Sequence, residues 1–272
     1  MRIRKVIFVG IISMCLAGMA ACKGSDVSMK SDAADRETMY QVATLQSLMV
    51  GNYDGFVRIG ELRKHGDIGL GTFSRVNGEM IVLDGNVYQA LGDGTVRIAS
   101  DSETTPFSTV TCFEPDIRAK LSPFDNISSL TQQLDSIVAA NGRNFIYALR
   151  LDVSTRSVTF RTEDAMDKPY APLAQVLPGK QRSFTRQNMS GTVVAVCFPS
   201  FFAGQNTPGW HFHFISSDRK EGGHMLDIST LETCTAKLDA TTFFNLYLPD
   251  DDTFSRRDLS DDMSDAIDKV ER

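Results

Sequence analysis

Apolar and polar residues alternate along much of this chain with the two-residue period that is typical of β-strands. Short apolar runs are bounded by Gly, Asn, Asp and Pro, which favour turns between strands. A first predicted hairpin joins residues 78–85 to residues 86–90. Further strands are expected at 95–99, 109–113, 145–151, 156–161, 191–198, 210–216, 224–231 and 242–248.

Helical periodicity is confined to a few segments. Residues 41–50 are expected to form a helix that ends at Gly51, and residues 129–140 form a second, capped by Ser128 or Ser129. The charged segment 255–272 predicts a tail with a helical turn. Because strands and helices mix without regular βα alternation, we predict an α+β fold with mixed and mainly antiparallel sheets.

Three prolines divide the body of the chain. Pro169, Pro172 and Pro178 fall within residues 165–182, which we interpret as the connection between two subdomains. The predicted N-terminal subdomain spans residues 41–165, and the C-terminal subdomain spans residues 166–272.

The N-terminus has the pattern of an export signal over residues 1–21, with a basic start and an uncharged apolar run. The sequence Met19-Ala20-Ala21-Cys22 resembles a bacterial lipobox, in which Cys22 is lipidated and attaches the protein to a membrane. Residues 22–40 would then be a tether, and the protein would be a periplasmic or cell-envelope lipoprotein. Alternatively, cleavage after the small residues releases a secreted protein. A buried N-terminal helix is a third interpretation.

The amino-acid composition indicates a globular protein and disfavours some classes of function. The chain has 272 residues, 42% hydrophobic and 23% charged, which is typical of a globular protein. Its net charge of −6 disfavours nucleic-acid binding, which depends on Lys and Arg. Beyond the predicted signal the cysteines are Cys112, Cys197 and Cys234, so at most one intramolecular disulfide can form, and their spacing does not predict a thiolate metal site.

Three of the four histidines fall within one 14-residue window. His211 and His213 share one face of the predicted strand 210–216, because alternate residues of a strand project from the same side. The other face of this strand carries aromatic residues. If a hairpin turns at Asp218-Arg219, His224 lies opposite His213. A bulge at the glycine pair 222–223 would shift this register.

Three neutral imidazoles at one point form a typical open zinc site, with a position left for water or substrate. We therefore predict a metal site on this hairpin, the alternative being a surface strand pattern without a metal. His65 lies in a distant Gly-rich loop and is not expected to be a ligand.

The chain lacks a nucleophile elbow, a phosphate-binding loop, a dinucleotide fingerprint and a His-Glu-x-x-His motif. The residues alone thus indicate a metal-dependent lyase, hydrolase or isomerase that acts on a small molecule. An exported, non-catalytic metal-binding protein is the alternative.

From about residue 44 to its end, the chain resembles the alpha-acetolactate decarboxylase family. The resemblance is carried by residues 49–55, 59–62, 65–73, 78–85, 105–107, 168–170, 191–192, 209–214 and 222–224. It implies conversion of 2-acetolactate to acetoin and carbon dioxide by a homodimer that uses neither thiamine nor pyridoxal phosphate. A larger 2-hydroxy-3-oxo acid is an alternative substrate.

The resemblance also implies a site. His211, His213 and His224 match ligands of Zn²⁺, although other divalent metals are possible; the ion would polarise the substrate and stabilise an enediolate. Glu79, Arg161 and Glu271 match catalytic residues, with Arg161 also placed to bind the substrate carboxylate. Thr72 matches a further substrate-binding position. The chain departs from the family at residues 162–167, where a Pro and a Gln are usual.

Overall fold

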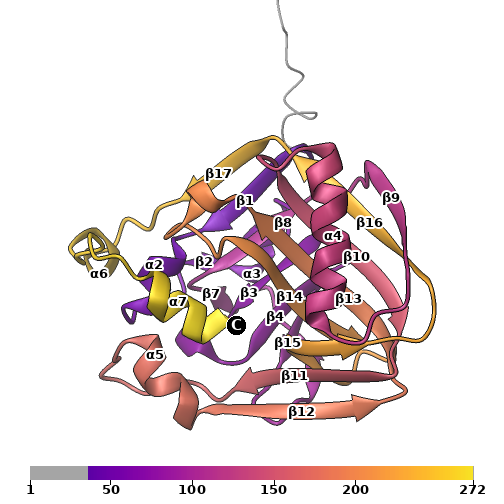
Figure 1. The fold of residues 1–272 in the computed structure, drawn as a ribbon. Coiled ribbons are helices and arrows are strands. Elements are labelled where there is room, and N and C mark those ends of the chain that lie inside the picture. Colours follow the sequence, from indigo (N-terminus) through magenta and orange to yellow (C-terminus); the bar gives the residue numbers. More distant parts are fainter. Residues whose placement is uncertain (1–35, 272) are drawn as a thin grey trace, which may run out of the picture.

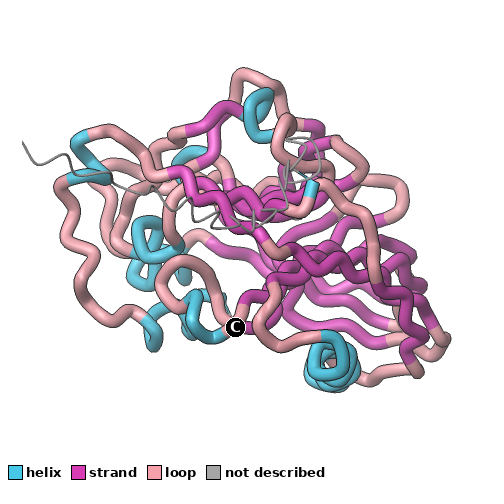
Figure 2. Tube along the Cα trace, turned by 90° about the horizontal axis from the view of Figure 1, so that it is seen from above, coloured by secondary structure: helices cyan, strands magenta, loops and turns pink. Residues whose placement is uncertain are grey.

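Two large β-sheets pack face to face in the computed structural model, which describes residues 36–271 (Figure 1). The tube viewed from above shows the two layers of strands, with most of the helices at the periphery (Figure 2). The predicted α+β fold class with mainly antiparallel sheets is confirmed. The predicted signal 1–21, most of the predicted tether 22–40 and Cys22 lie outside the described residues. Within residues 36–271, no helix has the length and apolar character needed to cross a membrane.

The first sheet has seven strands in the order β17-β1-β8-β3-β4-β5-β6. Only the β1–β17 pair is parallel. These strands are β1 (Thr38–Val42), β3 (Ile68–Thr72), β4 (Glu79–Leu83), β5 (Asn86–Ala90), β6 (Val96–Ile98), β8 (Ser108–Thr111) and β17 (Phe243–Tyr247). A separate short pair joins β2 (Val57–Arg58) to β7 (Thr104–Thr105).

The second sheet has eight antiparallel strands in the order β12-β11-β15-β14-β13-β10-β16-β9. They are β9 (Ile117–Leu121), β10 (Ile146–Ser154), β11 (Ser157–Glu163), β12 (Gln181–Gln187), β13 (Ser190–Phe198), β14 (Gly209–Ser216), β15 (Gly222–Ser229) and β16 (Cys234–Thr241).

Helices complete the fold around these sheets (Figure 1). The long helix α4 (Ile127–Asn141) covers the outer face of the eight-stranded sheet, where Leu130, Leu134 and Val138 pack into the core. The remaining helices are short: α2 (Leu45–Met49), α3 (Ile59–Leu62), α5 (Leu173–Val176), α6 (Asp252–Ser255) and α7 (Ser264–Glu271).

The predicted strands all have counterparts in the structure, with small shifts at their ends. Besides β1, four strands of five or more residues were missed. The edge strand β12 and the strand β9 carry many polar residues and are largely exposed, so they lack the apolar runs that predict a strand. β3 is rich in glycine, and β16 mixes polar and small residues. These strands are held in place by pairing with their neighbours, which a local pattern does not reveal.

The predicted helix 41–50 is wrong in its first part. Residues 38–42 form β1, and the helix begins only after Thr44, whose side chain accepts a hydrogen bond from Ser47 N. Ala43 between them has φ of 54°, which ends the strand. Apolar residues recur closely enough here to suit either a helix or a buried strand, and burial of β1 between β8 and β17 decides for the strand.

Strands from both sides of the predicted connection 165–182 enter the same sheet. β9, β10 and β11 precede this segment and belong to the eight-stranded sheet, whereas β17 follows it and pairs with β1. The boundary between the sheets therefore does not coincide with the predicted division at residues 165 and 166. Cys112, Cys197 and Cys234 all carry free thiols.

The N-cap of α4 is Asn126, and not Ser128 or Ser129 as predicted. Asn126 Oδ1 accepts a hydrogen bond of 2.9 Å from Ser129 N, and Ser129 Oγ accepts one of 3.2 Å from Asn126 N. Ser129 is thus the second member of a capping box and lies inside the helix.

We predict that Asn126→Ala lowers the free energy of unfolding by about 1 kcal/mol, because the first turn of α4 loses its acceptor. Ser128→Ala is the matched control and should change it by less than about 0.5 kcal/mol, since Ser128 is exposed. Urea unfolding followed by circular dichroism measures both. An equal loss in the two variants would contradict this assignment of the cap.

Candidate metal centre

The three histidines converge on the face of the β14–β15 hairpin that is turned toward the seven-stranded sheet. His213 pairs directly with His224, as the predicted hairpin requires, and His211 lies two residues earlier on β14. The glycine pair 222–223 keeps this register, and the bulge occurs on the other side of β15, against β11. Phe212 and Phe214 project from the opposite face into the core beneath α4.

The imidazole nitrogens lie at the mutual distances expected around one ion. His211 Nε2 is 3.2 Å from His213 Nε2 and 3.0 Å from His224 Nδ1. Ligand nitrogens at tetrahedral zinc stand about 3.3 Å apart, given Zn–N bonds of about 2.0–2.1 Å. All three ligand atoms fall within 4.8 Å of one another. The donor set therefore fits a divalent metal ion of the zinc type.

Hydrogen bonding and burial prepare these imidazoles to act as ligands. His213 Nδ1 donates to the carbonyl oxygen of Met80 at 2.9 Å, so its Nε2 is left with a free lone pair. His211 Nδ1 lies 3.2 Å from Glu271 Oε2, without the alignment of a hydrogen bond. Burial and then the Arg161 charge lower the pKa of His211 to about 3. Burial likewise holds the pKa of His213 and of His224 well below the usual range, so the three rings are neutral.

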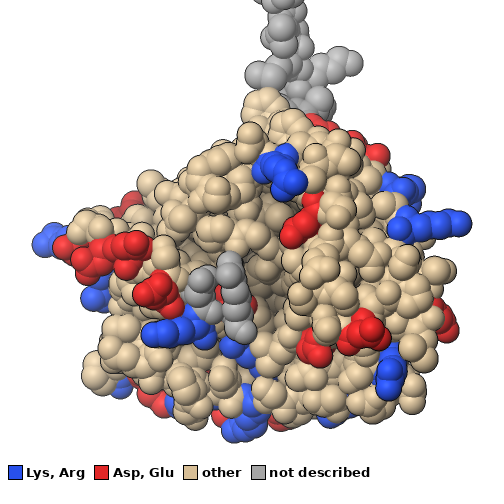
Figure 3. Space-filling view, viewed as in Figure 1, with Lys and Arg blue, Asp and Glu red and all other residues tan. Residues whose placement is uncertain are grey.

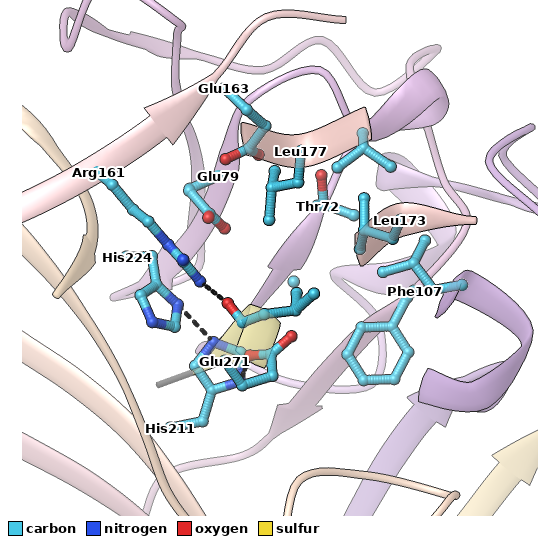
Figure 4. A pocket seen from close by; sticks show the side chains of 14 residues that line it. Thr72, Glu79, Phe107, Arg161, Glu163, Leu173, Leu177, His211, His224 and Glu271 are labelled. Carbon is cyan, nitrogen blue, oxygen red and sulfur yellow. Dashed lines mark hydrogen bonds and ion pairs between the residues drawn. The ribbon is translucent and has the colours of Figure 1, made fainter. Parts of the chain in front are cut away.

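Two cross-strand pairs carry the other predicted residues to the same place. Thr72 on β3 lies opposite Glu79 on β4, and Arg161 on β11 lies opposite His224 on β15. Opposed residues of antiparallel strands project from one face, so each sheet contributes one such pair to the pocket (Figure 4). The Thr72 hydroxyl donates to the Gly78 carbonyl at 2.8 Å and braces the turn before Glu79.

Three carboxyl groups and one guanidinium surround the histidines. Glu79 Oε2 lies 3.4 Å from His213 Nε2, and its side chain is 12% exposed. Glu271 is the last residue of α7, and its side chain is 8% exposed. Glu163 on β11 is only 2% exposed. Arg161 is the only cationic residue that lines this pocket within the described chain, and its Nη2 donates to the Val270 carbonyl (Figure 4).

Burial shifts the acidity of these carboxyl groups. It raises the pKa of Glu271 to about 7, against the opposing effect of Arg161. It also raises the pKa of Glu163 to about 7 and that of Glu79 well above its usual value, and the carboxyl group of Glu163 raises the pKa of Glu79 further. Carboxyl groups with such pKa values can hold or release a proton near neutral pH.

Helix α7 and apolar side chains cover part of the pocket. Ile267 and Val270 of α7 are each 4% exposed and pack among residues of α2 and α5. The free space in the pocket is about 40 Å³, enough for only a few water molecules. The apolar part of its lining consists of Leu48, Val76, Phe107, Leu173, Leu177 and Val270.

A wider groove of about 440 Å³ lies beside α4 and reaches His224. His224 and Glu271 line both this groove and the pocket. The surface is hollowed on this face, beside the end of α7, and acidic side chains gather at its edge over α6 (Figure 3).

Two features of the pocket were missed in the sequence. Leu173 and Leu177 lie in the Pro-rich connection, which covers the pocket as well as joining strands. Glu163 lies in the segment 162–167 where the chain departs from the family pattern, two residues beyond the end of the predicted strand 156–161. The strand continues to Glu163, so Glu163 alternates with Arg161 and faces the same side. His65 lies elsewhere, as expected, and stacks on Tyr40 with ring centroids 3.8 Å apart.

Comparisons with known proteins agree with this geometry. The family model of alpha-acetolactate decarboxylase matches residues 39–261. The alpha-acetolactate decarboxylases of Methanosarcina mazei and Bacillus subtilis are 39% and 34% identical to the chain, over 87% and 81% of it and over 81% and 85% of their own lengths. The crystal structure of alpha-acetolactate decarboxylase from Bacillus subtilis superimposes with a TM-score of 0.82 at 34% identity, covering 86% of this chain and 99% of that one. The chain therefore belongs to the alpha-acetolactate decarboxylase family.

Proposed function

We propose that this protein converts 2-acetolactate to acetoin and carbon dioxide, with a divalent metal ion, in the first place Zn²⁺, held by His211, His213 and His224. The observation that carries the proposal is the convergence of three neutral imidazoles with a buried guanidinium and carboxyl groups, in a chain of this family. When bound, the metal supplies Lewis-acid polarisation to the carbonyl and hydroxyl oxygen atoms of the substrate.

Arg161 is placed to bind the carboxylate group of the substrate. Its guanidinium lies within a buried pocket, where a charge-assisted pair with a carboxylate is strong and directional. The hydrogen bonds from Arg161 to the Val270 carbonyl and to Gln181 Oε1 fix the orientation of the guanidinium before the substrate binds. The bond between the carboxyl carbon and its neighbour breaks in the reaction, and the electron pair of that bond moves toward the substrate carbonyl.

The loss of carbon dioxide leaves an enediolate that needs one proton on carbon to become acetoin. Glu79 and Glu271 stand on the metal-facing side of the pocket, next to His213 and His211. Because burial raises the pKa of both carboxyl groups, either can hold a proton at neutral pH and deliver it. Helix α7 keeps bulk water away from this step, which leaves the fixed carboxyl groups as the proton source.

The proposal extends to the location and assembly of the protein. The basic residues Arg2, Arg4 and Lys5, followed by an uncharged apolar run, support export to the periplasm or cell envelope. Attachment through a lipidated Cys22 is favoured over release as a secreted protein. In this scheme the working unit is a homodimer, and it binds a small molecule and no nucleic acid.

The first test is acetoin formation from racemic 2-acetolactate before chelation, after chelation and after addition of Zn²⁺. We expect turnover to disappear with the metal and to return with it. His211→Ala should abolish both metal binding and turnover, because two imidazoles form a much weaker site. His65→Ala is the matched control and should keep both, since His65 lies outside the pocket.

Two results would contradict the proposal. Full activity of a metal-free protein would show that the reaction does not need a metal ion held by the histidines. One bound metal per chain without turnover would favour a non-catalytic metal-binding protein, and turnover only of a larger 2-hydroxy-3-oxo acid would change the substrate.

Glu271→Gln should lower kcat by about 100- to 10,000-fold, the usual range for loss of a general acid or base. The amide keeps the size of the side chain and its place in α7, so KM should change little. Glu232→Gln removes an exposed carboxylate far from the site and is the control. Steady-state kinetics with 2-acetolactate measure kcat and KM of both variants. An unchanged kcat in Glu271→Gln would exclude Glu271 from the proton transfer.

A further inference from the structure

The lining of the pocket divides into a polar side and an apolar side. Figure 4 shows the side chains of His224 and Arg161 on one side and those of Leu173 and Leu177 on the other. The molecule 2-acetolactate has the same division, because it carries a carboxylate, a hydroxyl and a carbonyl group together with two methyl groups. Its polar atoms are drawn to the metal ion and Arg161, so its methyl groups face the apolar lining.

Leu173 and Leu177 reach the pocket together because they lie on one helical face. Helix α5 runs directly into a 3₁₀ turn, Leu177–Gly179, and Leu177 itself keeps helical angles, with φ of −58° and ψ of −44°. Residues four apart on such a stretch project from the same side. The two side chains are only 2% and 6% exposed. In Figure 4, Leu177 enters from the side that carries Glu79, and Leu173 enters from the side of Phe107.

The backbone around these leucines is fixed at both ends. The Leu177 carbonyl accepts a hydrogen bond of 2.9 Å from Lys180 N, and the Lys180 carbonyl accepts one of 3.1 Å from Asp164 N. Before α5, the Tyr53 hydroxyl donates to the Ala171 carbonyl at 2.7 Å. Both leucines belong to the same core cluster as the apolar residues of α7. A wall that is packed and held in this way yields little to a larger group.

We propose that Leu177 is a specificity-determining residue, which limits the alkyl group on the hydroxyl-bearing carbon of the substrate to the size of a methyl group. The inference rests on the proposed decarboxylation and names the residue that selects 2-acetolactate over 2-aceto-2-hydroxybutanoate, which has one more methylene group at this carbon. The free space in the pocket is only about 40 Å³, so the added methylene group displaces atoms of the wall. One methylene group in an apolar pocket changes kcat/KM by about 10- to 200-fold.

The test measures kcat/KM for 2-aceto-2-hydroxybutanoate divided by kcat/KM for 2-acetolactate. The wild-type protein should prefer 2-acetolactate by about 10-fold or more. Leu177→Ala removes three carbon atoms from the wall, so the ratio should rise by about 10-fold or more. Leu177→Val removes a single carbon atom and disturbs the fold less, and it should raise the ratio by about fourfold.

Leu45→Ala is the matched control. Leu45 is 1% exposed and belongs to the same core cluster as Leu177, but it does not line the pocket. This variant should lower the melting temperature, because it leaves a cavity in the core, and it should keep the ratio of the wild type. Thermal unfolding and the metal content per chain identify any variant whose fold or metal site has failed.

A binding measurement provides a readout that does not depend on turnover. In 2,3-dihydroxy-2-methylbutanoate and 2-ethyl-2,3-dihydroxybutanoate a hydroxyl group replaces the carbonyl group, so neither compound can lose carbon dioxide by the proposed reaction. Isothermal titration calorimetry with the metal-loaded protein gives the Kd of each compound. Leu177→Ala should lower the Kd of the ethyl compound relative to that of the methyl compound by about 10-fold.

The outcomes separate this inference from the proposed function. An unchanged kcat/KM ratio in folded Leu177→Ala and Leu177→Val would overturn it, as would an equal change in Leu45→Ala or a wild-type protein without preference between the two acids. If the wild-type protein decarboxylates neither acid, the proposed function fails, and the two Kd values still decide whether Leu177 limits the size of the alkyl group.

Discussion

The hydrogen bond from the His213 imidazole to the Met80 carbonyl joins the two sheets at the point where the three histidines meet. His213 is fully buried on β14, and Met80 lies on β4 of the other sheet. A buried imidazole needs a partner for its N–H group, and a carbonyl on the facing sheet supplies it. The same contact fixes which nitrogen faces the other histidines. The packing of the sheets and the donor set of the metal site therefore depend on one interaction.

The face-to-face packing also explains why so many polar groups can gather inside the protein. Each sheet brings a cross-strand pair to the pocket, Thr72 with Glu79 and Arg161 with His224. In a strand, every second residue faces the same side, so a polar pair can stand at the end of an otherwise apolar interface. Electrostatic interactions are stronger in such a buried pocket than in bulk water, because the local dielectric constant is lower. Burial thus raises the pKa of the carboxyl groups and lowers that of the imidazoles, and both effects keep net charge out of the interior.

The sequence predicted the hairpin register and the histidine cluster, because both follow from the strand period and a single turn. The two-residue alternation placed His211 and His213 on one face, and the turn at Asp218-Arg219 placed His224 opposite His213. Glu79, Arg161 and Glu271 were predicted only from the resemblance to the family, because no local sequence pattern shows that β4, β11 and α7 lie together. Glu163 was missed because the predicted strand ended at Arg161, whereas β11 continues to Glu163. The polar strand β12 was missed because its pairing with β11, and not its composition, makes it a strand.

Unlike the other residues predicted at the pocket, Glu271 lies outside the segment that the family model matches. The family model matches residues 39–261 and so ends before α7, while Glu271 stands at the last described position. Its place beside His211 depends on Ile267 and Val270, which anchor only two turns of helix, and on the bond from Arg161 to the Val270 carbonyl. So short a helix gains its stability from packing and not from its own propensity. Helix α7 covers the pocket through the same two apolar side chains, so the packing that closes over the site also places one of its carboxyl groups.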